Sequence, residues 1–225
     1  LQDSFIFSGT ILDNIRKGRK FSHHAVLYRM NAQSAAIEKA FVKTGIAYRI
    51  IGGFRFYDRQ EVKDILAYLK VLINPRDDQN FARIVNTPRR GIGDATVATA
   101  QQIAAREGKS LYDVFRHFDQ YPEMSRKAGR IRPFVELILA LQSMAEKVSV
   151  HELIDATMVH SGYMEELRRL DEKDGRDRID NLGTLVSNAV DYEKNEEEPS
   201  LAGFLEEASL MSDIDNYDGG ADIAH

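Results

Sequence analysis

The stretch QEVKDILAYLKVLINP, residues 60–75, decides the fold class of this chain. Its large apolar residues return every three or four positions, which is the spacing of one face of an α-helix. These positions are Val62, Ile65, Leu66, Leu69 and Leu72 or Ile73. Pro75 ends the pattern, because proline cannot continue a helix. The stretch therefore predicts an amphipathic helix.

The same periodicity continues through the rest of the chain. It recurs at residues 78–85, 95–106, 110–118, 133–147, 150–160, 178–192 and 200–211. We expect helices at these positions, with breaks at 119–122 and 171–177 as candidate linkers. The first break is the better boundary, so the sequence predicts two parts, residues 1–120 and residues 121–225.

Strand signals occur only before residue 52. The apolar run 25–28 precedes a stretch that could form a helix as far as Gly45, and residues 47–51 have the aromatic and β-branched content of a second strand. Strand, helix, strand indicates a right-handed crossover and a small parallel sheet. The expected fold class is mainly α with a small N-terminal α/β part.

Composition excludes several classes of protein. The 225 residues contain no cysteine, which rules out a disulfide framework, a thiolate nucleophile and a zinc site built on cysteine. The six histidines are scattered, so we expect no metal site. No apolar run approaches the roughly 20 residues that span a bilayer. The sequence predicts a soluble, cytoplasmic protein with no membrane contact.

The net charge of −5 hides an uneven distribution. Residues 191–225 carry eleven acidic side chains and one basic side chain, whereas residues 1–190 carry 24 acidic and 29 basic ones. The body of the chain is therefore mildly basic and suits a polyanionic partner, while the acidic stretch is more typical of a solvated face than of a site.

The segment NTPRRGIGDAT, residues 86–96, is the most informative local pattern. Two glycines around Ile92 allow a tight turn that exposes N–H groups, and the helix that follows presents its positive end to phosphate. Arg89 and Arg90 would add charge-assisted, salt-sensitive contacts that do not depend on base sequence. A glycine turn before a helix is equally often a plain connection, so the pattern alone leaves both interpretations open.

Tyr28 and Arg29 form a second constellation. They follow the first predicted strand, at the sheet edge where open α/β folds place ligands. The arginine could reach a phosphate and the tyrosine could stack on a base, although a structural role is the alternative. The chain has no phosphate-binding loop and no strand ending in Asp-Glu, so it should not hydrolyse ATP alone.

Together these blocks resemble superfamily 1 DNA helicases of the UvrD, PcrA and Rep type. The resemblance rests on AVLYRMNAQS (residues 25–34), YRIIGG (48–53) and FYDRQEVKD (56–64), and then on residues 67–69, 74–75, 85–88 and 90–93 in the same order and spacing. A weaker echo occurs at residues 178–182. Many members have an arginine after Asn-Ala-Gln-Ser, whereas Ala35 follows Ser34 here.

The resemblance implies a fragment of a larger motor. Residues 1–120 would be a partial RecA-like domain, called 2A, and residues 121–225 a helical accessory domain, called 2B. The parent would be an ATP-dependent helicase that moves 3′ to 5′ on single-stranded DNA and unwinds duplex DNA, using ATP and Mg²⁺. The fragment alone would bind neither cofactor and would be inactive.

The resemblance also assigns roles to residues. Tyr28 would lie against the adenine, and Arg29 would be the catalytic residue that reaches the γ-phosphate. The duplex contact would come from Thr87, Arg89, Arg90, Gly91, Ile92, Gly93 and Thr96.

Two other interpretations stay open at this point. The chain could be a helical interaction module that docks a repair or transcription protein, with a glycine turn that is purely structural. A helicase fused to a nuclease would need nuclease motifs outside these residues.

Overall fold

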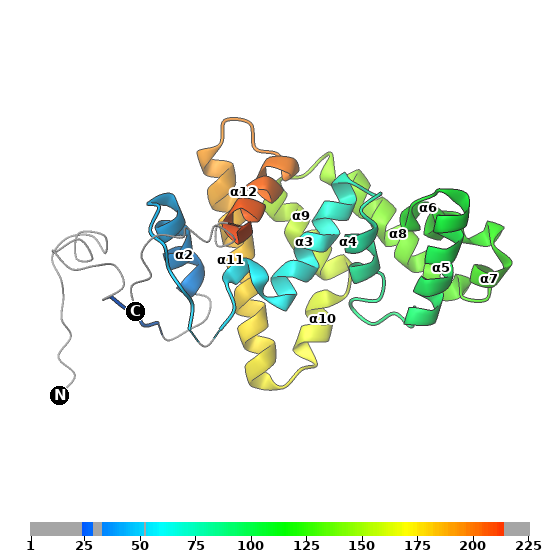
Figure 1. The fold of residues 1–225 in the computed structure, drawn as a ribbon, viewed down its shortest axis with the longest axis horizontal. Helices are drawn as coiled ribbons and strands as arrows, with labels where there is room; N and C mark the ends of the chain where they lie inside the picture. Colours follow the sequence, from blue (N-terminus) through cyan, green and yellow to red (C-terminus); the bar gives the residue numbers. More distant parts are fainter. Residues whose placement is uncertain (1–23, 29–32, 52, 214–225) are drawn as a thin grey trace.

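The structure is a computed structural model that describes residues 24–28, 33–51 and 53–213. Helices dominate these ranges, which hold no strand, so the mainly α prediction is confirmed. The helices are α2 (Ser34–Lys43), η3 (Phe56–Asp58), α3 (Gln60–Ile73), α4 (Asp78–Ile84), α5 (Asp94–Glu107), α6 (Leu111–Arg116), η4 (Phe118–Gln120), α7 (Pro122–Ser125), α8 (Ala128–Ala145), α9 (Val150–His160), α10 (Tyr163–Arg168), α11 (Glu172–Asn195) and α12 (Leu201–Asp213) (Figure 1).

The two predicted strands do not form at residues 25–28 and 47–51. Apolar and β-branched content makes a segment suitable for a sheet, but a strand also needs a neighbour that pairs with its N–H and C=O groups. The described residues supply no such neighbour. The helix between the segments is present as α2, and Gly45 ends it with a φ of 66°, as predicted.

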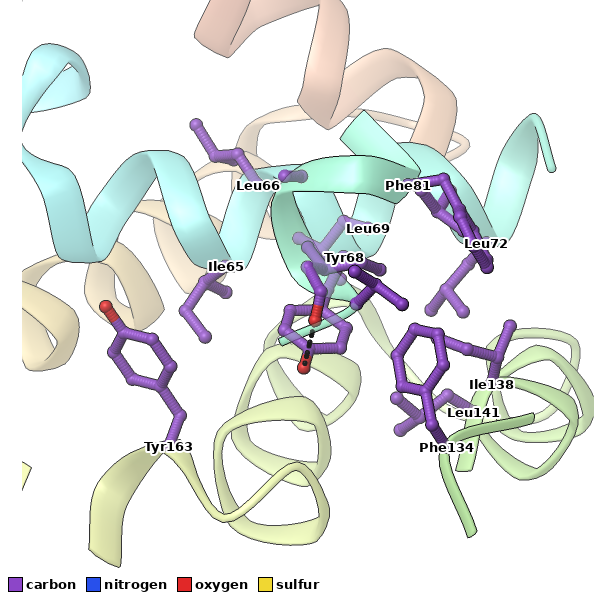
Figure 2. Packing of buried hydrophobic residues seen from close by; sticks show 14 of the residues in the cluster. Ile65, Leu66, Tyr68, Leu69, Leu72, Phe81, Phe134, Ile138, Leu141 and Tyr163 are labelled. Carbon is purple, nitrogen blue, oxygen red and sulfur yellow. Dashed lines mark hydrogen bonds between the residues drawn. The ribbon is translucent and has the colours of Figure 1, made fainter. Parts of the chain in front are cut away.

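Helix α3 lies at the centre of the molecule (Figure 1). It packs against α4, α8, α9, α11 and α12. Ten of its fourteen residues are buried, including the carboxylates Glu61 and Asp64. Figure 2 shows Tyr68 and Leu72 of α3 close to Phe134 and Ile138 of α8. The stretch that decides the fold class is thus a mostly buried helix rather than a surface one, and its buried acids need partners.

An aromatic cluster joins α4, α6 and α8. The ring centroid of Phe81 lies 5.2 Å from that of Phe115 and 5.6 Å from that of Phe134, both with T-shaped geometry. Edge-to-face contacts of this kind add to the stabilisation that comes from burial. Because Phe134 follows residue 120 and the other two rings precede it, the apolar core is continuous across the predicted boundary. The division at residue 120 stays a prediction.

The predicted break at residues 171–177 is wrong, because α11 begins at Glu172. The side chain of Asp171 accepts a hydrogen bond from the backbone N–H of Asp174 at 3.0 Å, which caps the helix. The many charged residues of this segment resemble a linker, but they are compatible with an exposed first turn. None of the helices in the described ranges is long and apolar enough to cross a bilayer.

Candidate nucleic-acid interface

The segment between α4 and α5 forms a turn whose backbone is bridged by the side chain of Asn86. Asn86 Oδ1 accepts a hydrogen bond from the backbone N–H of Arg90 at 2.8 Å and another from that of Ile92 at 3.3 Å. The Ile92 side chain is fully buried and anchors the tip of the turn in the core. The peptide bond between Thr87 and Pro88 is cis. The turn therefore has a defined shape without a ligand.

The two glycines of the turn have different roles. Gly91 has a φ of 74°, a region that side chains with a Cβ atom rarely adopt. Gly93 has a φ of −80° and a ψ of 172°, which any residue can adopt. Its carbonyl accepts the N–H of Thr96 at 2.9 Å, which begins α5. Only the first glycine is thus required by the backbone.

The neighbouring arginines point to different environments. Arg90 donates through Nη1 to the carbonyls of Ile84, at 3.0 Å, and Pro88, at 3.1 Å. Its Nη2 donates to the Tyr68 hydroxyl and to the Ser161 carbonyl. The guanidinium also lies 5.2 Å from the centre of the Phe134 ring. Arg90 is therefore held against the protein and fixes the turn to α3 and to the end of α9.

Arg89 is exposed, and no hydrogen bond or ion pair of its guanidinium is present in the described part of the chain. Its backbone N–H donates to Glu166 Oε2 at 3.0 Å, which ties the turn to α10. The Thr87 carbonyl accepts from the Tyr68 hydroxyl at 2.6 Å. Thr96 is half-buried in the first turn of α5. The structure thus brings the seven predicted contact residues together and leaves Arg89 as the free charge among them.

Tyr68 connects the turn to the core, since its ring is fully buried and its hydroxyl meets Thr87 and Arg90. Burial raises the pKa of the Tyr68 hydroxyl to about 12, and the positive charge of Arg90 opposes that rise. The hydroxyl therefore stays protonated and keeps donating to the turn at any pH near neutrality.

A pocket of about 260 Å³ lies beside the turn. Its lining comes from the start of α3, from Asn86, Thr87 and Arg89 of the turn, from α10 and the residues after it, and from α11. At the α3 side of the pocket, Asp64 Oδ2 accepts a hydrogen bond from the Tyr163 hydroxyl at 2.7 Å, and Asp64 Oδ1 accepts one from Arg83 Nε of α4 at 2.7 Å. Burial and the negative Asp64 both raise the pKa of Tyr163 well above its usual value. These bonds satisfy the buried carboxylate of α3.

A second polar cluster, which sequence reasoning missed, surrounds Arg59. Its guanidinium donates to Ser34 Oγ and to Asn181 Oδ1, each at 2.6 Å. Asn181 in turn donates to Glu61 Oε1 at 2.6 Å. Glu38 Oε2 accepts the backbone N–H of Phe56 at 3.1 Å. The cluster connects α2, α3 and α11.

Two opposing effects act on the pKa of Arg59 in this cluster. Burial lowers the pKa of Arg59, and the nearby carboxylates Glu38 and Glu61 oppose that effect. Tyr28 also lies close enough to act on Arg59. The Tyr28 side chain is 37% exposed, and Arg29 lies outside the described residues. The predicted adenine and γ-phosphate contacts stay predictions.

Within the described residues, no group of three or more His, Asp or Glu side chains is placed to hold a metal ion. The chain contains no cysteine that could contribute.

We expect that replacing Asn86 with alanine lowers the free energy of unfolding by about 1–3 kcal/mol, because two backbone N–H groups lose their acceptor. Urea denaturation followed by circular dichroism measures the change. Asn86→Asp keeps an oxygen in the same place and should lose less. An alanine variant as stable as the parent would show that the turn holds its shape without this side chain.

Comparison with known proteins places the chain in a family. The UvrD-like helicase C-terminal domain matches residues 3–219. The ATP-dependent DNA helicase PcrA of Staphylococcus aureus strain Mu50 is 38% identical over 210 residues, which cover 92% of this chain and 29% of the relative. The PcrA of Staphylococcus epidermidis strain ATCC 12228 is 39% identical over the same shares. The chain spans less than a third of these relatives and belongs to the UvrD-like helicase C-terminal domain family.

Proposed function

We propose that this chain is part of an ATP-dependent DNA helicase of the UvrD and PcrA type, which moves 3′ to 5′ along single-stranded DNA and unwinds duplex DNA. Its contribution would be a contact with the duplex backbone. The observation that carries the proposal is the preformed turn of residues 86–93, which presents an exposed arginine in a member of this family. The similarity to relatives that are ATP-dependent DNA helicases supports the same proposal.

The residues of the turn have different roles, since some would contact phosphate and others hold the turn in place. Arg89 supplies a free positive charge, and a guanidinium makes strong, bidentate bonds with phosphate. In the described part of the chain the backbone N–H groups of Asp94 and Ala95, at the start of α5, donate to no protein acceptor, so they can add to the contact. Arg90 holds the turn in place through its four hydrogen bonds to the protein. The contact involves phosphates only, so it reads no base sequence.

We further propose that ATP and Mg²⁺ bind a cleft that a longer protein completes. Tyr28 and Arg29 would belong to one wall of that cleft, in a partial RecA-like domain of residues 1–120. Residues 25–28 and 47–51 would gain their strand partners from the rest of that domain. Residues 121–225 would form the accessory domain, and repair or transcription proteins would be further partners.

The test of the duplex contact is Arg89→Ala. We expect the variant to bind a short duplex about three- to tenfold more weakly and to show a salt dependence reduced by about one unit in the slope of log K against log salt. The loss should be equal for duplexes of unrelated sequence. Fluorescence anisotropy at several salt concentrations measures both quantities.

Arg76→Ala is the matched control, because Arg76 is exposed at the other end of α4 and carries the same charge. It should bind like the parent chain. If the chain binds duplex DNA and Arg89→Ala equals Arg76→Ala at every salt concentration, the turn does not contact the backbone. The alternative, a helical module that docks a protein and uses a purely structural turn, would then take its place.

A further inference from the structure

A basic surface lies next to the Gly91 turn and comes from a different part of the chain. The side chain of Arg130, in the first turn of α8, lies against Gly91, and a Cβ atom built on that glycine would be 3.6 Å from Arg130 Nε. Arg126 and Lys127 form the two-residue link between α7 and α8. All three side chains are exposed. We call Arg126, Lys127 and Arg130 the α8 basic patch.

The charges of the α8 basic patch are not used inside the protein. Within the described residues, no hydrogen bond or ion pair involves the side-chain nitrogens of these three residues. By contrast, the next arginine along α8, Arg132, places its guanidinium 5.2 Å from the centre of the Phe118 ring. Three unpaired cations close together repel one another, so they are a cost to the isolated protein unless an anion compensates them.

The position of the patch follows from the packing around the turn. The proximity of Arg130 to Gly91 places the start of α8 beside the turn that precedes α5. The residue just before α7, Tyr121, donates instead to Glu107 Oε2 at the other end of α5, at 2.8 Å. The backbone N–H of Arg130 donates to the Lys127 carbonyl at 2.8 Å. Residues three apart at a helix start are neighbours on its surface, so Lys127 and Arg130 are close together.

Acidic side chains near the patch are few. Asp94 begins α5, and Glu123 lies in α7. Both are exposed, and solvent therefore screens their effect on the cations. Glu166 of α10 is half-buried, and its Oε2 accepts the backbone N–H of Arg89 on the neighbouring turn. With Arg89 on the turn and three cations in the α8 basic patch, positive charge exceeds negative charge on this surface. Its chemical complement is a chain of phosphates rather than a single acidic side chain.

We propose that the α8 basic patch is a second phosphate-backbone contact for duplex DNA, in which Arg130 is the central residue and Lys127 supports it. The inference rests on the proposed function, because the Gly91 turn would be the first contact on the same duplex. Two separate phosphate contacts, one before α5 and one at the start of α8, would hold the duplex in a defined direction across the protein. A single contact would leave the duplex free to rotate about that point.

The experiment uses the full 225-residue chain and a fluorescent duplex of mixed sequence. Arg130→Ala should bind about three- to tenfold more weakly than the parent, with a salt slope smaller by about one unit. Arg130→Lys keeps the charge and should retain most of the affinity. Arg76→Ala is again the matched control, and thermal unfolding of each variant checks that the fold is intact.

The double variant Arg89→Ala, Arg130→Ala tests whether the two arginines make independent contacts with the duplex. If the residues bind different phosphates, the two fold losses should multiply. A single strand of the same length should lose less than the duplex does, because it presents one backbone rather than two. Equal losses for single strand and duplex would mean that the patch attracts any polyanion and would overturn the proposal.

The outcomes also distinguish this inference from the proposed function. If Arg89→Ala weakens duplex binding but Arg130→Ala equals Arg76→Ala, the α8 basic patch is not a contact and the proposed function stands. If the parent chain does not bind duplex DNA at low salt, both proposals fail.

Discussion

Replacing Arg59 with alanine is expected to lower the free energy of unfolding by about 3–5 kcal/mol, as removing one partner from a buried charged cluster does. The Arg59 side chain is 8% exposed and lies among Glu38, which is 8% exposed, and Glu61, which is 4% exposed. Without the guanidinium both carboxylates stay buried and lose the favourable interaction with the Arg59 charge. Urea denaturation followed by circular dichroism measures the loss.

Two variants sharpen this test. Arg59→Lys keeps the charge, but one ammonium group cannot reproduce the fork that reaches Ser34 and Asn181 together, so we expect an intermediate loss. Arg76→Ala removes an exposed arginine and should change stability by less than about 0.5 kcal/mol. An Arg59→Ala variant that loses no more than the Arg76→Ala control would show that the cluster does not stabilise the fold.

The Arg59 cluster shows that sequence blocks far apart along the chain are in direct contact in the fold. Ser34, Arg59 and Asn181 come from three blocks that the family resemblance singles out, and Asn181 comes from the weakest of them. The structure joins them by direct hydrogen bonds across 122 residues of sequence. Periodicity could not predict this, because it reports which face of a helix is buried and not which distant side chain that face meets.

The glycine turn shows a similar limit at short range. Arg89 and Arg90 are adjacent, and the sequence gives no reason to treat them differently. Their roles separate only in three dimensions, because Arg90 contacts Tyr68 of α3, Phe134 of α8 and the Ser161 carbonyl just after α9. The composition of the turn was sufficient to predict its location, and the surrounding helices decide which charge is free.

Helix positions were predictable because each depends on a local pattern. The repeat of apolar residues located α3, α4 and α9 within a few residues of their bounds. The strands at 25–28 and 47–51 depend on partners elsewhere, so their local content was not enough. The start of α11 was missed for a third reason: its first turns are charged on all sides and carry no apolar repeat.

The second large effect is expected at Phe81. Replacing it with alanine should lower the free energy of unfolding by about 3–5 kcal/mol, because a fully buried ring leaves a cavity that its neighbours cannot fill. Phe81 also contacts the rings of Phe115 and Phe134, which would each lose an edge-to-face partner. Urea denaturation gives the value, and Phe54→Ala is the control, since Phe54 is 75% exposed.

The Phe81 variant also tests the division at residue 120. Phe81 precedes that residue and Phe134 follows it, so a core shared by both parts should unfold in one transition that shifts as a whole. Two parts with independent cores would instead give two transitions, of which Phe81→Ala would move one. Fluorescence of the tyrosines and circular dichroism should therefore report the same midpoint in the variant. If the two probes separate, the boundary divides the chain energetically, and the aromatic contacts across it are weaker than their geometry implies.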